Sequence, residues 1–249
     1  MSVLVTGAGT GIGAAISAAF AKAGYAVAVT DIDEEAAKAT ARELKTLGLR
    51  LDVVDRESIR QAAETAEREL GPLEVWISNA GVSTMAPFTE VTERDWDTVM
   101  DTNAKGVFLC GQEAARRLRR NGGGVIVNMA SMAGKRGGVP FLAHYIASKF
   151  AVVGLTQAMA AELAGDNIRV NSVCPSYVVT SMQERELRWE AELRGITTEE
   201  VKNLYLADTP LGRLATPADV AAAVLFLASP TSSFITGEAL AINGGSFMD

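Results

Sequence analysis

The chain has 249 residues, of which 48% are hydrophobic and 21% are charged, and its net charge is −7. This composition is that of an ordinary globular protein, and the acidic balance argues against nucleic acid as the main partner. With no apolar run of 18 residues, no signal peptide, one histidine and two isolated cysteines, the sequence predicts a cytoplasmic protein without a membrane span or a metal site.

Short apolar runs alternate with helical patterns along most of the chain. We expect seven strands, over residues 3–6, 26–30, 49–53, 74–78, 124–129, 168–173 and 238–242. Helices are expected over about 12–23, 33–47, 56–70, 93–119 and 145–164. Strands that are apolar throughout are typical of sheets covered on both faces, and this alternation indicates parallel βαβ units. The prediction is a single α/β domain over residues 1–249, a doubly wound Rossmann fold whose seven-stranded parallel sheet has helices on both faces.

One segment interrupts this alternation. Residues 181–213 carry two helical patterns between the sixth and seventh expected strands. A long insertion of this kind is often a lid or a binding loop. The alternative is a structural crossover elaborated by helices, and we favour a helical substrate lid at about 181–213.

A glycine-rich loop, TGAGTGIG at 6–13, follows the first expected strand and opens the first helix. Read from Gly7, the loop does not fit G-x-G-x-x-G, because Ile12 stands where the third glycine belongs, but it fits G-x-x-x-G-x-G. Such a loop lets the backbone approach a pyrophosphate at a helix N-terminus. The alternative is a plain tight turn. The predicted cofactor contacts are Gly7, Thr10, Gly11, Ile12 and Gly13.

Acidic residues follow the second and third expected strands. Asp31 lies about 20 residues past the loop, where a carboxylate accepts from an adenosine ribose 2′-OH and repels a 2′-phosphate. The alternative role is a helix cap, which suits Asp33 better and leaves Asp31 free. Nothing basic lies in TDIDEE, so we predict NAD (NADH) rather than NADP, with Ile32 beside it. Asp52 and Val53 are predicted at the adenine, although Asp52 could instead be a helix-start carboxylate.

The chain resembles the compact short-chain dehydrogenases/reductases from residue 2 to about 245. The resemblance rests on the glycine loop, SNAG at 78–81, Asn103, Ser131 and Tyr145-x-x-x-Lys149, in this order. Each motif alone is weak, but the combination is specific. One departure is Ser176, where the family usually has Gly after Pro175, which affects fine substrate geometry and not the reaction class.

The resemblance implies the roles of the catalytic residues. Tyr145 would be the acid/base, and Lys149, one helical turn further on the same face, would favour the phenolate and bond the nicotinamide ribose. Lowering a phenol pKa from about 10 to about 7 needs roughly 4 kcal/mol. Ser131 would donate to the substrate oxygen. Asn103 would hold a water in a proton relay, the alternative being a solvent-facing Asn.

The resemblance also implies further contacts. The predicted cofactor contacts are completed by Asn79, Ala80, Gly81, Tyr145, Lys149, Pro175, Val178 and Thr180. The predicted substrate contacts are Met132, His144, Tyr177 and Met182. Because neighbouring residues point in different directions on a helix, we interpret His144 as a packing residue or a pocket wall rather than as a catalyst.

The expected activity is hydride transfer between NAD(H) and a small polar secondary alcohol or ketone, such as a polyol, sugar alcohol or hydroxyketone. One alternative is a 3-oxoacyl-[acyl-carrier-protein] reductase, in which ARRLRR at 115–120 would dock the acidic carrier; we prefer to interpret these arginines as cations at a helix C-terminus. Epimerases usually carry a larger C-terminal domain, and an intact Asn-Ser-Tyr-Lys set argues against a regulator with a decayed site. The resemblance implies a homotetramer.

Overall fold

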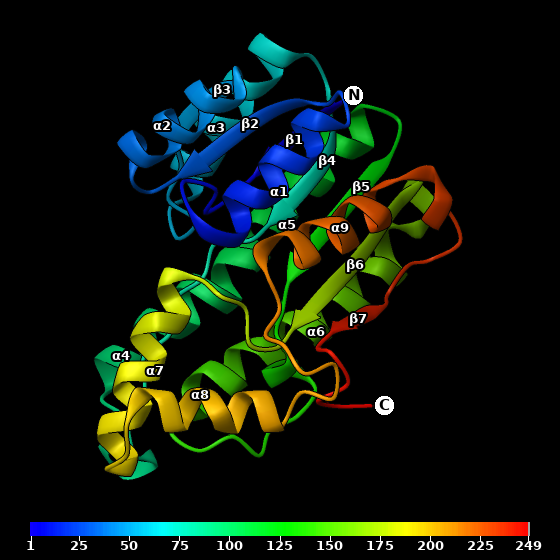
Figure 1. Cartoon of the computed structure of the whole chain (residues 1–249). Coiled ribbons are helices and arrows are strands. Elements are labelled where there is room, and N and C mark those ends of the chain that lie inside the picture. The colour runs from blue at the N-terminus through cyan, green and yellow to red at the C-terminus, as the bar shows by residue number, and fades with distance from the viewer. Residues whose placement is uncertain (249) are drawn as a thin grey trace.

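The computed structural model describes residues 1–248 and has a seven-stranded sheet at its centre (Figure 1). The strands are β1 (Ser2–Val5), β2 (Ala26–Asp31), β3 (Leu47–Arg50), β4 (Leu73–Ser78), β5 (Gly124–Met129), β6 (Ile168–Pro175) and β7 (Ala239–Ile242). Their order is β3-β2-β1-β4-β5-β6-β7, and every neighbouring pair is parallel. The strand order reverses between β1 and β4, which confirms the predicted doubly wound fold.

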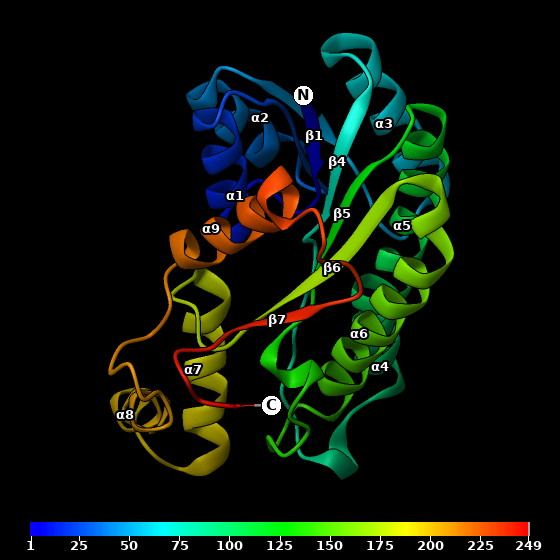
Figure 2. The same ribbon diagram turned by 90° about the vertical axis from the view of Figure 1, so that its right-hand side faces the viewer.

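Helices cover both faces of the sheet (Figure 2). One layer contains α1 (Gly11–Lys22), α2 (Glu34–Leu44) and α9 (Pro217–Ala228), and the other contains α3 (Arg56–Leu70), α5 (Gly106–Arg120) and α6 (Ala143–Leu163). Successive strand residues point to opposite faces, so Val5 packs in the first layer and Leu4 in the second. Short 3-10 segments lie at Phe88–Glu90, Met132–Gly134, Ala164–Asp166 and Pro230–Ser232.

The expected insertion forms two helices, α7 (Ser181–Arg194) and α8 (Thr198–Ala207). They lie beyond the carboxyl ends of the strands (Figures 1 and 2). Their shared apolar cluster contains Ala191, Val201 and Tyr205. Within residues 1–248 no helix combines the length and the hydropathy that a membrane span needs.

The third strand lies earlier in the chain than expected. Residues 49–53 were predicted, but the strand is Leu47–Arg50, paired with β2 from Ala28 to Asp31. The cause is Lys45, whose left-handed φ of 55° ends α2 at Leu44 rather than at residue 47. Residues 51–53 therefore follow the strand instead of belonging to it.

The helices also differ from the prediction in two places. The expected helix over 93–119 is divided into α4 (Glu93–Met100), a π-helical segment (Asp101–Lys105) and α5. The backbone N–H of Gly106 bonds the carbonyl of Asp101, five residues back, as a π-turn requires. The sequence interpretation did not include α9, which begins at a Thr216–Asp219 capping box with Pro217 in its first turn.

Candidate active site

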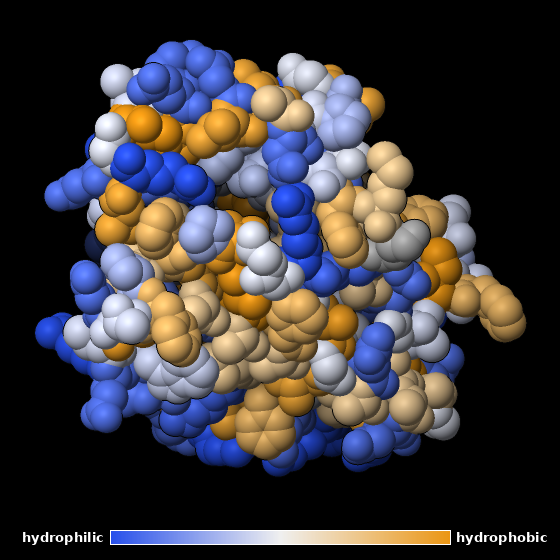
Figure 3. Space-filling model, turned by 90° about the horizontal axis from the view of Figure 1, so that it is seen from below, coloured by the Kyte–Doolittle hydropathy of each residue, from blue (hydrophilic) through white to orange (hydrophobic). Residues whose placement is uncertain are grey.

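A cavity of about 520 Å³ lies at the carboxyl edge of the sheet, next to the reversal of strand order. Apolar side chains gather over the middle of this side of the molecule, bordered by hydrophilic ones (Figure 3). In open parallel sheets this switch point is where ligands bind. The cavity is lined from the turns after β1, β2, β4, β5 and β6 and from α7.

Most of the predicted site residues line this cavity. They are Gly7, Thr10, Gly11, Ile12, Gly13, Asp31, Ile32, Asp52, Val53, Asn79, Ala80, Gly81, Ser131, Met132, Tyr145, Lys149, Pro175, Tyr177, Val178, Thr180 and Met182. Asn103 and His144 are predicted site residues that do not line it. The sequence thus located one continuous cavity from motifs spread over more than 170 positions.

The glycine loop packs tightly against the end of β4. A Cβ on Gly7, whose φ is +60°, would lie 2.6 Å from Ala80 Cα, and a Cβ on Gly13 would lie 2.3 Å from the Gly7 carbonyl oxygen. The Asn79 amide donates to the carbonyls of Thr6 and Gly7 at 3.0 and 2.8 Å. Side chains are therefore excluded from the loop where the backbone must come close.

Helix α1 has an open amino end. Its N-cap residue Thr10 makes no side-chain hydrogen bond to the first turn, and that turn contains no acidic residue. By contrast, α2, α3, α4, α7, α8 and α9 all have side-chain caps. A Cβ on Gly11 would meet only Thr180 Cγ2, at 3.8 Å. Free N–H groups, a positive dipole end and open space above them fit the diphosphate of a dinucleotide.

Asp31 connects the glycine loop to β2. Its Oδ2 accepts from the Gly9 N–H at 3.0 Å and its Oδ1 from the Asp33 N–H at 3.1 Å. Asp33 caps α2 as expected, accepting from Glu35 and Ala36. Asp31 does not cap α2, as expected, although both of its oxygens already accept locally. Each carboxylate oxygen still has a second lone pair, so a ribose hydroxyl can be accommodated.

Asp52 lies in the turn between β3 and α3. Its Oδ1 accepts from the Val54 N–H at 3.1 Å, and its Oδ2 is 4.0 Å from Arg50 Nη2. The cap of α3 is Asp55, which accepts from the Glu57 N–H. Asp52 is therefore not the helix-start carboxylate, but it does not end the third strand either.

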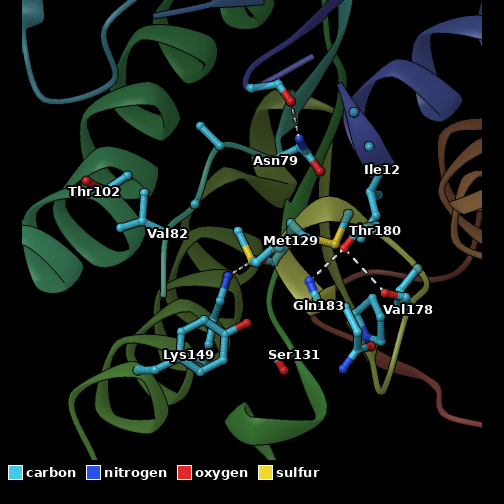
Figure 4. Close-up of a pocket in the computed structure, with 18 of the residues that line it drawn as sticks. Ile12, Asn79, Val82, Thr102, Met129, Ser131, Lys149, Val178, Thr180 and Gln183 are labelled. Atoms are coloured by element: carbon cyan, nitrogen blue, oxygen red, sulfur yellow. Dashed lines mark hydrogen bonds between the residues drawn. The ribbon is translucent and has the colours of Figure 1, made fainter. Parts of the chain in front are cut away.

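Tyr145 and Lys149 both lie on α6. Lys149 is 4% exposed, and its Nζ donates to the Met129 carbonyl at 2.9 Å while lying 5.5 Å from the centroid of the Tyr145 ring. Figure 4 shows Lys149 pointing to Met129, with Thr180 and Val178 across the cavity. Burial lowers the pKa of Lys149 to about 8.

The phenol of Tyr145 is a weaker acid in the protein alone than the sequence interpretation assumed. Burial raises its pKa, Glu186 raises it further by charge, and hydrogen bonding with Ser131 lowers it. In the protein alone, burial outweighs the hydrogen bond with Ser131, and Lys149 is not among the groups that shift the pKa of Tyr145. Ser131 follows β5, and its Oγ also accepts from the Ala133 N–H at 3.1 Å.

Asn103 is completely buried in the π-helical segment. Its Oδ1 accepts from the Val82 N–H at 2.8 Å, and its Nδ2 donates to the Val82 carbonyl at 2.9 Å and to Ser148 Oγ at 3.1 Å. The solvent-facing alternative is therefore wrong. Asn103 ties the turn after β4 to α6 from behind the cavity.

His144 is a packing residue and not a pocket wall. It is completely buried, and its Nε2 lies 2.6 Å from Thr84 Oγ1. Its Nδ1 has no hydrogen-bond partner in the part of the chain that the structure covers. Burial lowers its pKa. The half of the interpretation that put it at the substrate is wrong, because its ring points to the turn after β4.

Several lining residues were not predicted. They include Val82, Met129, Val139, Leu142, Gln183, Arg185 and Glu186. Glu186 could have been found, because Met182 was predicted and residues i and i+4 share a helix face. Tyr177, which was predicted, stacks on Tyr205 at 4.0 Å and donates to Asp208 Oδ2 at 3.3 Å.

Comparisons with known proteins agree with this geometry. Residues 7–246 match the family described as Enoyl-(Acyl carrier protein) reductase. The chain is 39% identical over 249 residues to the D-threitol dehydrogenase of Mycolicibacterium smegmatis, covering 97% of this chain and 91% of that protein. It is 36% identical over 253 residues to the 3-oxoacyl-[acyl-carrier-protein] reductase FabG of Staphylococcus aureus, covering 99% and 98%.

Among solved structures, the sorbitol-6-phosphate 2-dehydrogenase SrlD of Erwinia amylovora superposes with a TM-score of 0.95. The two chains are 32% identical, and the match covers 100% of each. Sequence and fold therefore agree over the full length of the chain.

Proposed function

The chain belongs to the short-chain dehydrogenases/reductases and is an oxidoreductase of secondary alcohols and ketones, and on that premise we propose NAD(H) as its cofactor and a small polyol as its substrate. The observation that carries the proposal is a single cavity. It joins the open amino end of α1 to Ser131, Tyr145 and Lys149. Family members use nicotinamide cofactors. The relatives of this chain named above include two dehydrogenases of sugar alcohols, one of them phosphorylated, and a reductase of 3-oxoacyl groups on acyl-carrier protein.

Tyr145 is proposed as the proton acceptor in alcohol oxidation and as the proton donor in ketone reduction. A bound nicotinamide supplies the hydride acceptor and, when oxidised, a positive charge in the cavity. A positive charge favours the phenolate and so offsets the burial that raises the pKa of Tyr145. Ser131 donates to the substrate oxygen and stabilises the charge that develops there.

Lys149 is proposed to fix the nicotinamide ribose and to stabilise the phenolate. Its Nζ already donates to Met129, and an ammonium has three donors, so two remain for these tasks. Asn103 is proposed to complete a proton relay behind Lys149. A Cβ on Gly81 would lie 3.2 Å from Asn103 Oδ1 and 3.7 Å from Lys149 Nζ, so these two groups flank the same glycine.

The choice of NAD over NADP is supported by the charges around the cavity. Asp31 and Asp52 line it where β2 and β3 end. Within residues 1–248, its only lysine and arginine are Lys149 on α6 and Arg185 on α7, neither of which comes from the turns after β2 and β3. A 2′-phosphate beside Asp31 would meet a carboxylate, and Arg50, which pairs with Asp31 in the sheet, has its guanidinium 4.0 Å from Asp52 Oδ2.

A polyol is favoured over a carrier-bound thioester by the arginines of α5. Arg117 is 3% exposed and pairs with Glu67 and Glu113, and Arg119 pairs with Asp166. These arginines lie in the last turn of α5, which leads into the start of β5, at the edge of the sheet away from the cavity. Arg117 and Arg119 are thus paired within the chain, and they lie at the wrong edge of the sheet to bring a carrier-bound thioester to the cavity.

The proposed function is tested with a panel of alcohols and ketones followed at the NADH absorbance. Threitol, sorbitol and butane-2,3-diol should be oxidised with NAD, and an acetoacetyl thioester should be reduced more slowly than their ketones. Rapid reduction of the thioester with NADPH would instead support the carrier-protein alternative.

The quaternary and domain organisation completes the proposal. A single domain over 1–249 with α7 and α8 as a lid at about 181–213 is supported by one shared sheet and by cavity residues on α7. A homotetramer is supported by exposed Phe108 and Phe150 on α5 and α6. Cys110 and Cys174 are buried and form no disulfide within residues 1–248, which suits the reducing cytoplasm.

A further inference from the structure

One carboxylate lies at the reacting end of the cavity and has no role in the mechanism above. Glu186 on α7 lines the cavity together with Ser131, Tyr145 and Lys149. It is half-buried, and burial raises its pKa. Its charge raises the pKa of both Tyr145 and Lys149, which places it within electrostatic reach of the reacting groups.

The carboxylate is held in place by the turn that follows β4. Ser83 Oγ donates to Glu186 Oε1 at 2.5 Å, and Ser83 is only 6% exposed. The next residue, Thr84, bonds the buried ring of His144 on α6. His144 thus holds Thr84, and the neighbouring Ser83 fixes one oxygen of the Glu186 carboxylate.

The rest of the carboxylate is available to a ligand. Within residues 1–248, Ser83 is the only hydrogen-bond partner of the Glu186 carboxylate, and the charges of Arg185 and Lys149 act on it without an ion pair. An ionised carboxylate has about four acceptor sites and no donor. A substrate O–H placed here gains a charge-assisted bond, whereas an alkyl group would leave the carboxylate desolvated and unpaired.

We propose that Glu186, positioned by Ser83, selects substrates that carry a terminal hydroxyl on the carbon next to the reacting carbinol and disfavours those in which a phosphate replaces that hydroxyl. A phosphate group presents hydrogen-bond acceptors, and an ionised Glu186 carboxylate has no proton to donate to them. Arg185 on the neighbouring position of α7 also lines the cavity, but it is exposed, and within residues 1–248 it forms no ion pair with Glu186. This inference rests on the proposed function and names the chemistry of its substrate.

The test compares Glu186→Gln with Glu184→Gln, which removes the same charge from an exposed position of the same helix outside the cavity. Each variant is assayed for NAD-dependent oxidation of threitol and of butane-2,3-diol, which lacks the terminal hydroxyls. The ratio of the two kcat/KM values cancels any common effect on Tyr145. In Glu186→Gln this ratio should fall about tenfold, the difference between a charged and a neutral acceptor. Glu184→Gln should leave it within twofold.

The phosphate arm uses propane-1,2-diol and its 1-phosphate, in which a phosphate replaces the hydroxyl beside the reacting carbinol. The wild type should prefer the free diol, and Glu186→Gln should narrow that preference at least fivefold. Ser83→Ala should raise KM for threitol several-fold with little change in kcat, and should leave KM for butane-2,3-diol unchanged. A purely structural Ser83 would affect both substrates equally.

The outcomes separate the inference from the proposed function. A wild type that oxidises butane-2,3-diol but prefers it to threitol, or an unchanged ratio in Glu186→Gln, overturns the inference and leaves the proposed function standing. A wild type that oxidises no alcohol of the panel overturns both. Unchanged melting temperatures confirm that the variants are folded.

Discussion

Lys149 reaches along Tyr145 to the main chain of β5, since its Nζ donates to the Met129 carbonyl at 2.9 Å and lies 5.5 Å from the centroid of the Tyr145 ring. The spacing of four residues on α6 brings the two side chains together, but the fixed point is the strand end. The ammonium is therefore positioned by the sheet, and the phenol lies against it.

Tyr145→Phe should lower kcat by about 10²–10⁴-fold, because the substrate proton loses its acceptor. The glycine loop and Asp31 are held in place by contacts that do not involve the phenolic oxygen of Tyr145. NADH affinity, measured by fluorescence titration, should stay within threefold of the wild type. Near-normal turnover would refute the role of Tyr145.

Lys149→Met should make the protein more stable and inactive. Burial lowers the pKa of Lys149 to about 8 from an ordinary value of 10.5, so charging it in the folded state costs about 3 kcal/mol at pH 7. Losing the hydrogen bond to the Met129 carbonyl offsets part of this stabilisation. The free energy of unfolding is therefore expected to rise by about 1–2 kcal/mol.

The pH dependence of that gain provides the check. Between pH 8 and 10.5 the unfolded chain keeps the lysine proton and the folded chain has released it, so wild-type stability rises with pH in this window. The advantage of Lys149→Met in thermal unfolding should therefore shrink as the pH rises from 7 to 10. A constant advantage would show that Lys149 is not the titrating group.

Asp31→Ser should reduce kcat/KM for NADH roughly tenfold and should raise the use of NADPH, because a carboxylate that accepts from ribose and repels phosphate is removed. Asp33→Ser is the matched control. It removes a charge two residues away, and serine retains the cap of α2. Equal NADH-to-NADPH ratios in the two variants would contradict the assignment.

Gly13→Ala should destabilise the protein by about 1–3 kcal/mol, because the new Cβ would lie 2.3 Å from the Gly7 carbonyl oxygen. Gly165→Ala, where nothing lies within 4 Å of the added Cβ, should be nearly neutral. Denaturant unfolding measures both. A tolerated alanine at position 13 would mean that the loop is looser than its contacts indicate.

Phe150→Glu should dissociate the proposed homotetramer. Phe150 is 45% exposed on α6, and a buried charge at a helix-pairing interface would have no partner. Phe88→Glu changes an exposed phenylalanine outside α5 and α6. Analytical ultracentrifugation at micromolar concentration should give a smaller species for the first variant alone, and a monomeric wild type would exclude the tetramer.

The sheet and the cavity were predictable because strand periodicity and the glycine loop are local signals. Helix α9 was not predicted because its residues are apolar on nearly every side, so no amphipathic period marks it, although Thr216, Pro217 and Asp219 give a readable start. The third strand was misplaced because nothing in the sequence announces that Lys45 adopts a left-handed conformation.

The limits at the site have the same origin. His144 was assigned from residue type and neighbours alone, as a histidine beside the reactive tyrosine, and Glu186 was not singled out from its charged segment. Their surroundings come from Thr84 and Ser83, more than 50 positions away in the chain. Only tertiary packing decides that the histidine faces inward and the glutamate faces the cavity.

The open amino end of α1 has a consequence for the lifetime of the protein. A dinucleotide bound there would supply the cap that the sequence omits, and it would bind the folded chain alone. At a concentration 100 times its Kd, such a ligand adds about 2.7 kcal/mol to the free energy of unfolding. The folded population, and with it resistance to proteolysis, would then rise and fall with the cellular supply of nicotinamide dinucleotide.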